Sequence, residues 1–139
     1  MNTDSECIFC RIVAGDIPSI KVYEDDLTLC FMDINPASDG HALIIPKEHW
    51  QNVHSIPDEL ISAVAVSARR VAGAVHAVLK PDGINLVQSN GEGAAQSVGH
   101  FHMHVLPRTN GDELKLNWDL VAGDMGRIGE VAGKIKSAL

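Results

Sequence analysis

The stretch His100-Phe101-His102-Met103-His104-Val105-Leu106 decides the fold of this chain, because three histidines alternate in it with apolar residues. Successive side chains of a β-strand point to opposite faces, so the three imidazoles share one face and the apolar side chains share the other. Neighbouring imidazoles on that face would lie ~6.5 to 7 Å apart, at ~3.3 Å per residue. We therefore predict a buried strand that carries a row of histidines.

Such a row has three interpretations: a metal cluster, a row of catalytic groups, or polar residues that lie in a core by accident. Accident is the weakest of these, because a buried imidazole without a hydrogen-bond partner costs about 1 to 3 kcal/mol. The alternation by itself leaves both the metal and the catalytic interpretation open.

The sequence around the row predicts four further short strands. Residues 20–24 and 27–32 form a hairpin around Glu24-Asp25-Asp26, and residues 41–45 form a third strand that Pro46 stops. Residues 84–88 form the fourth strand, and the histidine stretch is the fifth. Hairpin-like strands interrupted by one long helix favour an α+β fold with an antiparallel sheet of about five strands.

The long helix begins near Ser55, a candidate N-cap that Asp58 and Glu59 follow in the first turn. Its apolar residues recur three and four positions apart and form one stripe that would pack on the sheet: Leu60, Ile61, Val64, Ala68, Val71, Val75 and Leu79. Lys80-Pro81-Asp82-Gly83 ends this central helix. A weaker helical pattern, loosened by four glycines, predicts a C-terminal helix within residues 120–139.

Length and charge limit the class of protein. A chain of 139 residues fits one domain, and a formal net charge of −7 offers no basic surface for a nucleic-acid polymer. No stretch approaches the ~20 apolar residues that a membrane span needs. The first six residues are polar and acidic, unlike a secretory signal, so we expect a cytoplasmic protein that binds neither nucleic acid nor membrane.

The three cysteines argue against a disulfide framework, because their number is odd and only Cys7 and Cys10 form a C-x-x-C pair. This pair is suited to a metal or to redox chemistry. A thioredoxin-like role is disfavoured, since no βαβ pattern follows the pair. Cys30 lies in an apolar run and is expected to be a small core residue.

The histidine stretch, the preceding Gln96-Ser97-Val98 and the segment Gly40-His41-Ala42-Leu43-Ile44-Ile45-Pro46-Lys47-Glu48-His49 together resemble the histidine triad (HIT) family. The family motif, His-φ-His-φ-His-φ-φ with φ apolar, is met at every position from His100 to Leu106. The resemblance runs over residues 7–108, and the tail at 109–139 is less diagnostic. It implies a single HIT domain over residues 1–139.

This resemblance implies a nucleotide-binding α+β fold, usually a homodimer with a continuous sheet, that cleaves the α-phosphate bond of a small nucleotide substrate through a nucleotidyl-histidine intermediate. The expected substrates are purine nucleoside phosphoramidates, related nucleotidyl conjugates or dinucleoside polyphosphates. His102 resembles the nucleophile, and a neutral imidazole can attack phosphorus without first losing a proton. His104 resembles the member that contacts the phosphate, and His41 resembles a histidine that supports the row. Without the resemblance, a core histidine with its hydrogen bonds satisfied describes His41 equally well.

The segment Asn90-Gly91-Glu92-Gly93-Ala94-Ala95-Gln96-Ser97 resembles the family's phosphate loop. Small residues let backbone N–H groups approach an anion. Ser97 is expected to contact the phosphate or to protonate the leaving group. The loop departs from the family pattern, so the sequence leaves open which of Ser89, Asn90 and Gln96 contacts the phosphate. Taken alone, Gln96 and Ser97 would be an ordinary polar turn.

The nucleoside half of the site is also suggested by the resemblance. Asp33 resembles the ribose ligand, because a carboxylate can accept hydrogen bonds from both ribose hydroxyls. Four apolar residues are candidates to hold the base: Phe9 and Ile34, together with Ile12 and Phe31. Packing in the core is a competing role for all four.

Cys7 and Cys10 are spaced for two thiolates on one zinc ion, and a tetrahedral site needs two further ligands. The resemblance to bacterial relatives implies His49 and His100. Such a centre would be structural, and the chemistry at phosphorus would need no metal. The alternative is a pair of reduced thiols without metal.

Three functions follow as hypotheses. The first is hydrolysis, which His104 favours because the transferase and phosphorylase branches of the superfamily typically have glutamine at its position. The second is a nucleotide-binding or scaffolding module whose catalysis is vestigial. The third is a zinc-dependent hydrolase in which the histidine row itself holds a catalytic metal. His54 and His76 are assigned no function.

Overall fold

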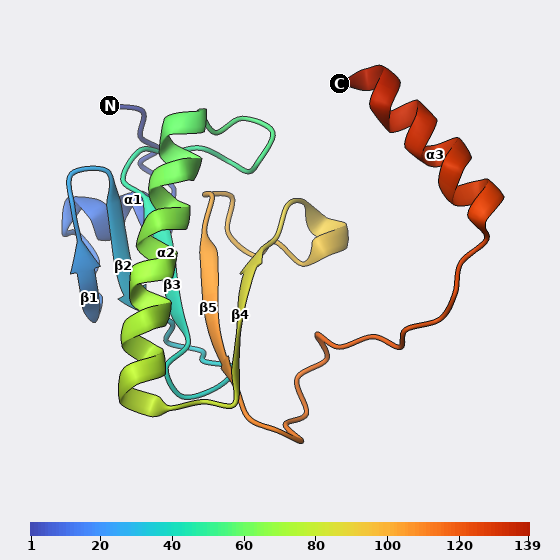
Figure 1. The fold of residues 1–139 in the computed structure, drawn as a ribbon. Coiled ribbons are helices and arrows are strands. Elements are labelled where there is room, and N and C mark those ends of the chain that lie inside the picture. The colour runs from blue at the N-terminus through green and yellow to red at the C-terminus, as the bar shows by residue number, and fades with distance from the viewer.

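The structure is a computed structural model that describes all 139 residues (Figure 1). Its elements follow one another as α1 (Ile8–Ala14), β1 (Lys21–Glu24), β2 (Thr28–Met32), β3 (Ala42–Pro46), α2 (Asp58–Leu79), β4 (Gly83–Gln88), the 3-10 helix η1 (Glu92–Ala94), β5 (Met103–Arg108) and α3 (Met125–Ala138). The five strands form one sheet in the order β1-β2-β3-β5-β4, and every neighbouring pair is antiparallel. The predicted α+β fold, with its central and C-terminal helices, is confirmed.

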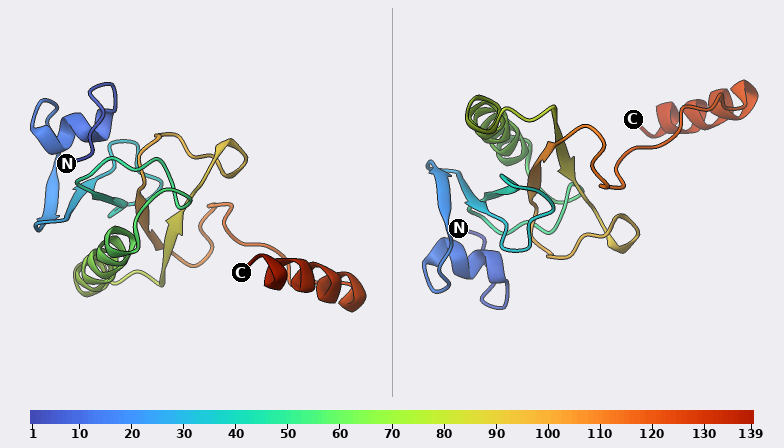
Figure 2. Two further views of the ribbon diagram at one scale, coloured as in Figure 1. Left: turned by 90° about the horizontal axis from the view of Figure 1, so that it is seen from above. Right: turned by 90° about the horizontal axis from the view of Figure 1, so that it is seen from below.

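Each face of the sheet carries its own core. On one face, the stripe of α2 packs on strand residues that include Cys30, Ile44 and Val105. On the other face, α1 packs on Phe31 and Leu43 (Figures 1 and 2). The strands β1 and β4 are the two edges of the sheet.

The helix α2 differs from the prediction at its start. Pro57 is the N-cap residue and makes no side-chain cap, while the Ser55 hydroxyl hydrogen-bonds the Asn52 carbonyl, so the predicted Ser55 cap is wrong. Asp58 and Glu59 occupy the first turn as predicted, where negative charge complements the helix dipole. At the other end Lys80 takes the left-handed conformation and terminates the helix.

By length and composition α2 could cross a membrane, since its mean hydropathy reaches 1.2 over an 18-residue window. This differs from the expectation that no stretch approaches a membrane span. The stripe of α2, however, lies in the core of the domain, with Val64 and Ala68 fully buried against the sheet. A core helix can meet the same criterion as a membrane span, but only 22% of this window is buried, so packing on the sheet accounts for only part of the hydropathy of α2.

The sequence did not predict α1, and the helical pattern that it shows from residue 120 begins before the start of α3. The helix α1 was not predicted, because seven residues are too few to display a helical period. It ends at Gly15, which takes a left-handed conformation at φ 83°. The helix α3 begins only at Met125, because the Asp124 side chain accepts a hydrogen bond from the Arg127 N–H and so caps it.

The loop between β2 and β3 is fixed against the rest of the domain. Gly40 has a φ of 89°, and a Cβ atom there would lie 2.4 Å from Leu79 Cδ1 and 3.1 Å from Pro107 Cγ. The Ser38 hydroxyl donates to the Pro107 carbonyl at 2.8 Å. This loop is therefore held between the end of α2 and the end of β5.

Candidate active site

The three histidines of the row face the same side of the sheet, as the alternation predicts. The Phe9 ring on α1 meets the His100 and His102 rings edge-on, at centroid distances of 5.9 and 5.3 Å. Phe101 and Val105 lie instead in the core beneath α2. The predicted division of the stretch into a histidine face and an apolar face is confirmed.

The strand itself is shorter than predicted. β5 begins at Met103, so His100, Phe101 and His102 lie before it. The Phe101 N–H donates to the Trp50 carbonyl instead of to a strand neighbour, and Pro46 at the end of β3 has no N–H to offer. The spacing of the row was also overestimated, since the His102 and His104 ring centroids are 5.0 Å apart.

His102 is oriented by the backbone of its own row. Its Nδ1 lies 2.7 Å from the His100 carbonyl oxygen, which can only accept, so Nδ1 carries the hydrogen. The other nitrogen, Nε2, then holds a free lone pair. Burial lowers the pKa of His102 below its usual value, although the carbonyl bond and Asp33 act in the opposite direction. A neutral imidazole with a bare Nε2 can act as a nucleophile.

A chain of hydrogen bonds fixes the ring of His104. The Ala37 N–H donates to His41 Nδ1 at 3.0 Å, so the hydrogen of a neutral His41 is on Nε2. His41 Nε2 lies 2.8 Å from His104 Nδ1 and donates to it. His104 therefore carries its hydrogen on Nε2 and can donate it to an oxyanion.

Burial keeps both histidines of this hydrogen-bond chain neutral. Burial and the nearby His102 and His41 rings lower the pKa of His104 to about 4, against the opposing charge of Asp33. Burial also lowers the pKa of His41, and Asp33 acts against it. Near neutral pH both rings are uncharged, and neutral rings are what the hydrogen-bond chain requires.

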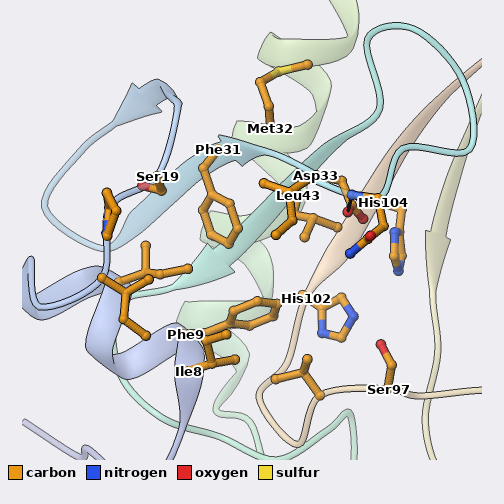
Figure 3. A pocket seen from close by; sticks show the side chains of 16 residues that line it. Ile8, Phe9, Ser19, Phe31, Met32, Asp33, Leu43, Ser97, His102 and His104 are labelled. Carbon is orange, nitrogen blue, oxygen red and sulfur yellow. Dashed lines mark hydrogen bonds between the residues drawn. The ribbon is translucent and has the colours of Figure 1, made fainter.

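His102 and His104 line a cleft of about 230 Å³ (Figure 3). Its polar end is formed by Asp33, Ser97, His102 and His104. The apolar remainder is formed mainly by α1 and β2, including Ile8, Phe9, Ile12, Phe31 and Leu43. The arrangement therefore joins an apolar chamber to a set of nitrogen and oxygen groups.

The residues predicted to hold a nucleoside all line this cleft. Asp33 accepts a hydrogen bond from the Asn35 N–H through Oδ1, and its Oδ2 lies 3.5 Å from His41 Nε2. Phe9 and Phe31 are buried in the core and stack edge-on at 5.4 Å, so they pack in the core and form the cleft wall at once. Ile34 is 84% exposed and lines the cleft without belonging to the core.

The polar side chains of the loop before the row have two kinds of surroundings: Ser97 lines the cleft, whereas Asn90 and Gln96 bind backbone groups. Ser97 lines the same cleft as His102 and His104 (Figure 3). The amides of Asn90 and Gln96 are not among the cleft residues. Asn90 Oδ1 accepts from the Val53 N–H, and Gln96 closes its own loop by accepting from the Gly91 N–H. Ser97 is thus the residue of this loop whose side chain the structure brings to the histidines.

A second group of side chains lies behind the row. Cys7, Cys10, His49 and His100 bring their sulfur and nitrogen atoms within 4.8 Å of one another. The Sγ–Nδ1 distances are 3.5 Å from Cys7 to His100, 3.6 Å from Cys10 to His100 and 3.4 Å from Cys10 to His49. Tetrahedral zinc with sulfur at ~2.3 Å and nitrogen at ~2.0 to 2.1 Å would separate its sulfur and nitrogen ligands by ~3.5 Å. The donor set and its spacing fit a tetrahedral metal ion.

The hydrogen bonds around this group leave the right atoms free. His100 Nε2 lies 2.9 Å from the Pro46 carbonyl and donates to it, so the bare Nδ1 faces the thiols. Asn2 brackets His49, because its carbonyl accepts the His49 N–H and its side-chain amide donates to the His49 carbonyl. Most of these hydrogen bonds involve backbone groups, and a pattern of side chains in the sequence does not predict them.

The chain is similar to known proteins in both sequence and fold. The model of the family described as "HIT domain" matches residues 14–111. The adenosine 5'-monophosphoramidase HNT1 of Saccharomyces cerevisiae is 38% identical over 137 residues, which span 98% of this chain and 84% of the yeast protein.

Two solved structures are similar to this one over nearly its whole length. SMU.412c from Streptococcus mutans has a TM-score of 0.92 and 39% identity, with coverage of 99% of this chain and 87% of its own. A Zn-bound histidine triad family protein from Mycobacterium smegmatis has a TM-score of 0.76 and 39% identity, with coverage of 96% and 98%.

Proposed function

Because the chain belongs to the HIT domain family, we propose that it is a hydrolase that cleaves the α-phosphate bond of purine nucleoside phosphoramidates, related nucleotidyl conjugates or dinucleoside polyphosphates. The observation that carries this proposal is the hydrogen bond from His102 Nδ1 to the His100 carbonyl, which leaves Nε2 bare next to the cleft. The name of the yeast relative, a monophosphoramidase, supports the same class of substrate.

In the first step His102 Nε2 attacks the α-phosphorus, the nitrogen–phosphorus bond forms, and the bond to the leaving group breaks. The His100 carbonyl then stabilises the positive charge that the ring acquires through Nδ1–H. His104 donates Nε2–H to a non-bridging oxygen. In the second step water attacks, the bond to His102 breaks, and a nucleoside monophosphate is released.

Ser97 has two roles in this scheme that the contacts permit. Its hydroxyl contacts the phosphate, or it protonates the leaving group and recovers its proton from the attacking water. Asp33 binds the ribose hydroxyls, while Phe9 and Ile34 hold the base together with Ile12 and Phe31. Asn90 and Gln96 then shape the loop through the backbone contacts described above, and a direct contact of either amide with the phosphate would need a rotation of its side chain.

Zinc held by Cys7, Cys10, His49 and His100 would be a closed structural centre without a position for water. The Zn-bound Mycobacterium smegmatis relative supports this identity of the metal. The centre would act on catalysis by position, because His100 supplies the carbonyl that orients His102. No metal is required at phosphorus.

A catalytic metal in the row is the competing hypothesis, because Asp33, His41 and His104 also bring ligand atoms within 4.8 Å of one another. The hydrogen bond from the Ala37 N–H argues against it. Since Nδ1 of His41 is occupied, the Nε2 that faces His104 carries a hydrogen and is not a free ligand atom.

We propose the domain organisation, cellular compartment and oligomeric state of the enzyme from the same resemblance. It is a single HIT domain over residues 1–139, it acts in the cytoplasm on small nucleotides, and it forms a homodimer. A net charge of −7 disfavours a nucleic-acid polymer or an anionic membrane as partner.

The test is to trap the intermediate. The protein is mixed with adenosine phosphoramidate, adenylated lysine or diadenosine polyphosphate, quenched in base and analysed by intact mass and peptide mapping. We expect a nucleotidyl adduct on His102 and its loss in His102→Asn, while nucleotide affinity stays nearly unchanged. His54→Asn, at an exposed histidine, serves as the control.

The outcomes separate the hypotheses. Nucleotide binding with neither adduct nor turnover would favour the binding module. Turnover that a chelator abolishes while the fold and His102 remain intact would favour the catalytic-zinc alternative. A His102→Asn variant with more than a few per cent of the normal rate would exclude His102 as the nucleophile.

A further inference from the structure

The apolar part of the cleft contains a single polar side chain, that of Ser19. The other polar side chains that line the cleft come from the segment after β2 or from the histidine row and the loop before it: Asp33, Asn35, Ser97, His102 and His104. Ser19 belongs instead to the connection between α1 and β1, next to Ile17 and Pro18, which also line the cleft. Figure 3 shows Ser19 on the opposite side of the cleft from His102 and Ser97.

Hydrogen bonds hold the backbone on both sides of Ser19. The Ile17 N–H donates to the Arg11 carbonyl on α1 at 3.3 Å, and the Met32 N–H on β2 donates to the Ile20 carbonyl at 2.9 Å. The proline directly before Ser19 has its own φ angle fixed by its ring. The position of Ser19 in the cleft wall is therefore set by both α1 and β2, although Ser19 itself lies in a loop.

The hydroxyl of Ser19 is available to a ligand. It makes no hydrogen bond within the chain, and it is not among the fully buried polar atoms that lack a partner, so solvent reaches it. The remaining side chains of the apolar part offer neither a donor nor an acceptor of a strong hydrogen bond. Because a hydroxyl both donates and accepts, Ser19 can bind either an amino group or a carbonyl oxygen.

The proposed site of reaction sets the direction in which a nucleotide lies in the cleft. With its phosphate at His102 and its ribose at Asp33, the nucleotide extends its base into the apolar part. A purine is joined to the ribose through N9 of its smaller ring, and its amino or carbonyl group at C6 lies on the far edge of its larger ring. This polar group therefore approaches the side of the cleft that carries Ser19 (Figure 3).

The group at C6 needs a partner, because the side chains around it are apolar. A polar group that leaves water without gaining a hydrogen bond weakens binding by roughly 5- to 150-fold. Ser19 has the one side chain in this part of the cleft that can take the place of the lost water. A pyrimidine has a single ring, extends less far from the ribose and leaves the Ser19 hydroxyl without a partner.

From these observations we propose that Ser19 is the residue that recognises the base. Its hydroxyl hydrogen-bonds the group at C6 of a purine, accepting from the amino group of adenine or donating to the carbonyl oxygen of guanine. The inference rests on the proposed function, which supplies the positions of the phosphate and the ribose. It adds a residue that determines specificity and takes no part in the chemistry at phosphorus. The site then accepts both purines and prefers them to pyrimidines.

The first experiment changes the ligand and leaves the protein intact. Wild type is titrated in a calorimeter with adenosine monophosphate and with purine riboside monophosphate, which carries only a hydrogen at C6. We expect the purine riboside nucleotide to bind about 10-fold more weakly, because it cannot use the Ser19 hydroxyl. The measurement is of equilibrium binding and needs no turnover. Equal affinities for the two nucleotides would overturn the proposal.

The second experiment removes the hydroxyl. Ser19→Ala should weaken the binding of adenosine and guanosine monophosphates by about 10-fold and that of the purine riboside nucleotide by less than about 2-fold. Ser19→Thr keeps a hydroxyl and should retain the preference for adenosine over purine riboside. Ser62→Ala, at an exposed serine of α2 outside the cleft, is the matched control. A loss in Ser19→Ala that is equal for all three nucleotides, or no loss, would contradict the assignment.

The third experiment separates this inference from the proposed function. In steady-state hydrolysis, Ser19→Ala should lower kcat/KM for adenosine phosphoramidate by about 10-fold, mainly through KM, and reduce the preference over uridine phosphoramidate. Turnover that Ser19→Ala leaves unchanged would overturn the inference and leave the hydrolase intact. A protein that binds adenosine monophosphate through Ser19 without hydrolysing the phosphoramidate would support the role of Ser19 and contradict the hydrolase. No binding of either purine nucleotide would overturn both.

Discussion

His41 can be tested as a positioning residue, because its two ring nitrogens do separate tasks. Nδ1 accepts the Ala37 N–H and Nε2 donates to His104. His41→Asn keeps an acceptor near Nδ1 but removes the donor to His104. His41→Gln offers an amide hydrogen near the position of Nε2 and so retains the donor.

The size of the effect follows from the bonds that are lost. In His41→Asn the buried Nδ1 of His104 loses its donor, which costs about 1 to 3 kcal/mol. If that energy is lost from the transition state, kcat falls by roughly 5- to 150-fold. The KM should change little, because His41 is not among the residues that line the cleft. His41→Gln should be milder than His41→Asn.

The assay is steady-state hydrolysis of an adenosine phosphoramidate, combined with ¹⁵N shifts that report which nitrogen of His104 carries the hydrogen. Wild type should show the hydrogen on Nε2, and His41→Asn should show a mixture. Equal rates for the two variants, or an unchanged His104 tautomer in His41→Asn, would refute the positioning role. His76→Asn, at an exposed histidine on α2, controls for the loss of a histidine in general.

Four other predictions concern separate parts of the molecule. Hydrogen bonds from Thr28 and neighbouring groups outweigh burial and lower the pKa of Asp25 to about 2, so its contribution is complete above the unfolded value of 3.8 and is lost as the pH falls through 2. Asp25→Asn should lower the unfolding free energy at pH 7 by about 1 kcal/mol, discounted for solvent screening, and the difference in urea midpoints should shrink as the pH falls from 3.8 through 2. A chelator should lower the melting temperature of wild type and leave that of Cys7→Ser unchanged; equal shifts would argue against the metal centre. Ser97→Ala should slow poor leaving groups more than good ones if Ser97 protonates them, and all equally if it only contacts the phosphate. Ile34→Ala should raise KM without changing thermal stability, because Ile34 lies outside the core.

Much of the fold was predictable because its signals are periodic. Alternation defined the two faces of the histidine stretch, and a three-and-four spacing defined the stripe of α2. The start of β5 was not predictable, since it depends on whether the Phe101 N–H bonds to a strand or to the Trp50 carbonyl. Periodicity describes side chains and carries no information about a single backbone partner.

The same limit applies to the site. The histidines, the cysteine pair and Asp33 were found because their side chains have distinctive chemistry, and the structure brings them together. What it adds is the set of backbone groups that orient them: the carbonyls of Pro46 and His100 and the N–H of Ala37. For Asn90 and Gln96, side-chain chemistry alone suggested a contact with the phosphate. In the structure their side-chain oxygens instead accept hydrogen bonds from the backbone N–H groups of Val53 and Gly91.

Gly40 lies between Leu79 and Pro107, in the loop that carries the Ala37 N–H. A side chain at this position would be strained by the φ of 89° and would require the Leu79 side chain to move, and a shift of the loop would also move the amide that aligns His41. Attempts to redesign the cleft should treat position 40 as part of it, although Gly40 is not among the residues that line the cleft.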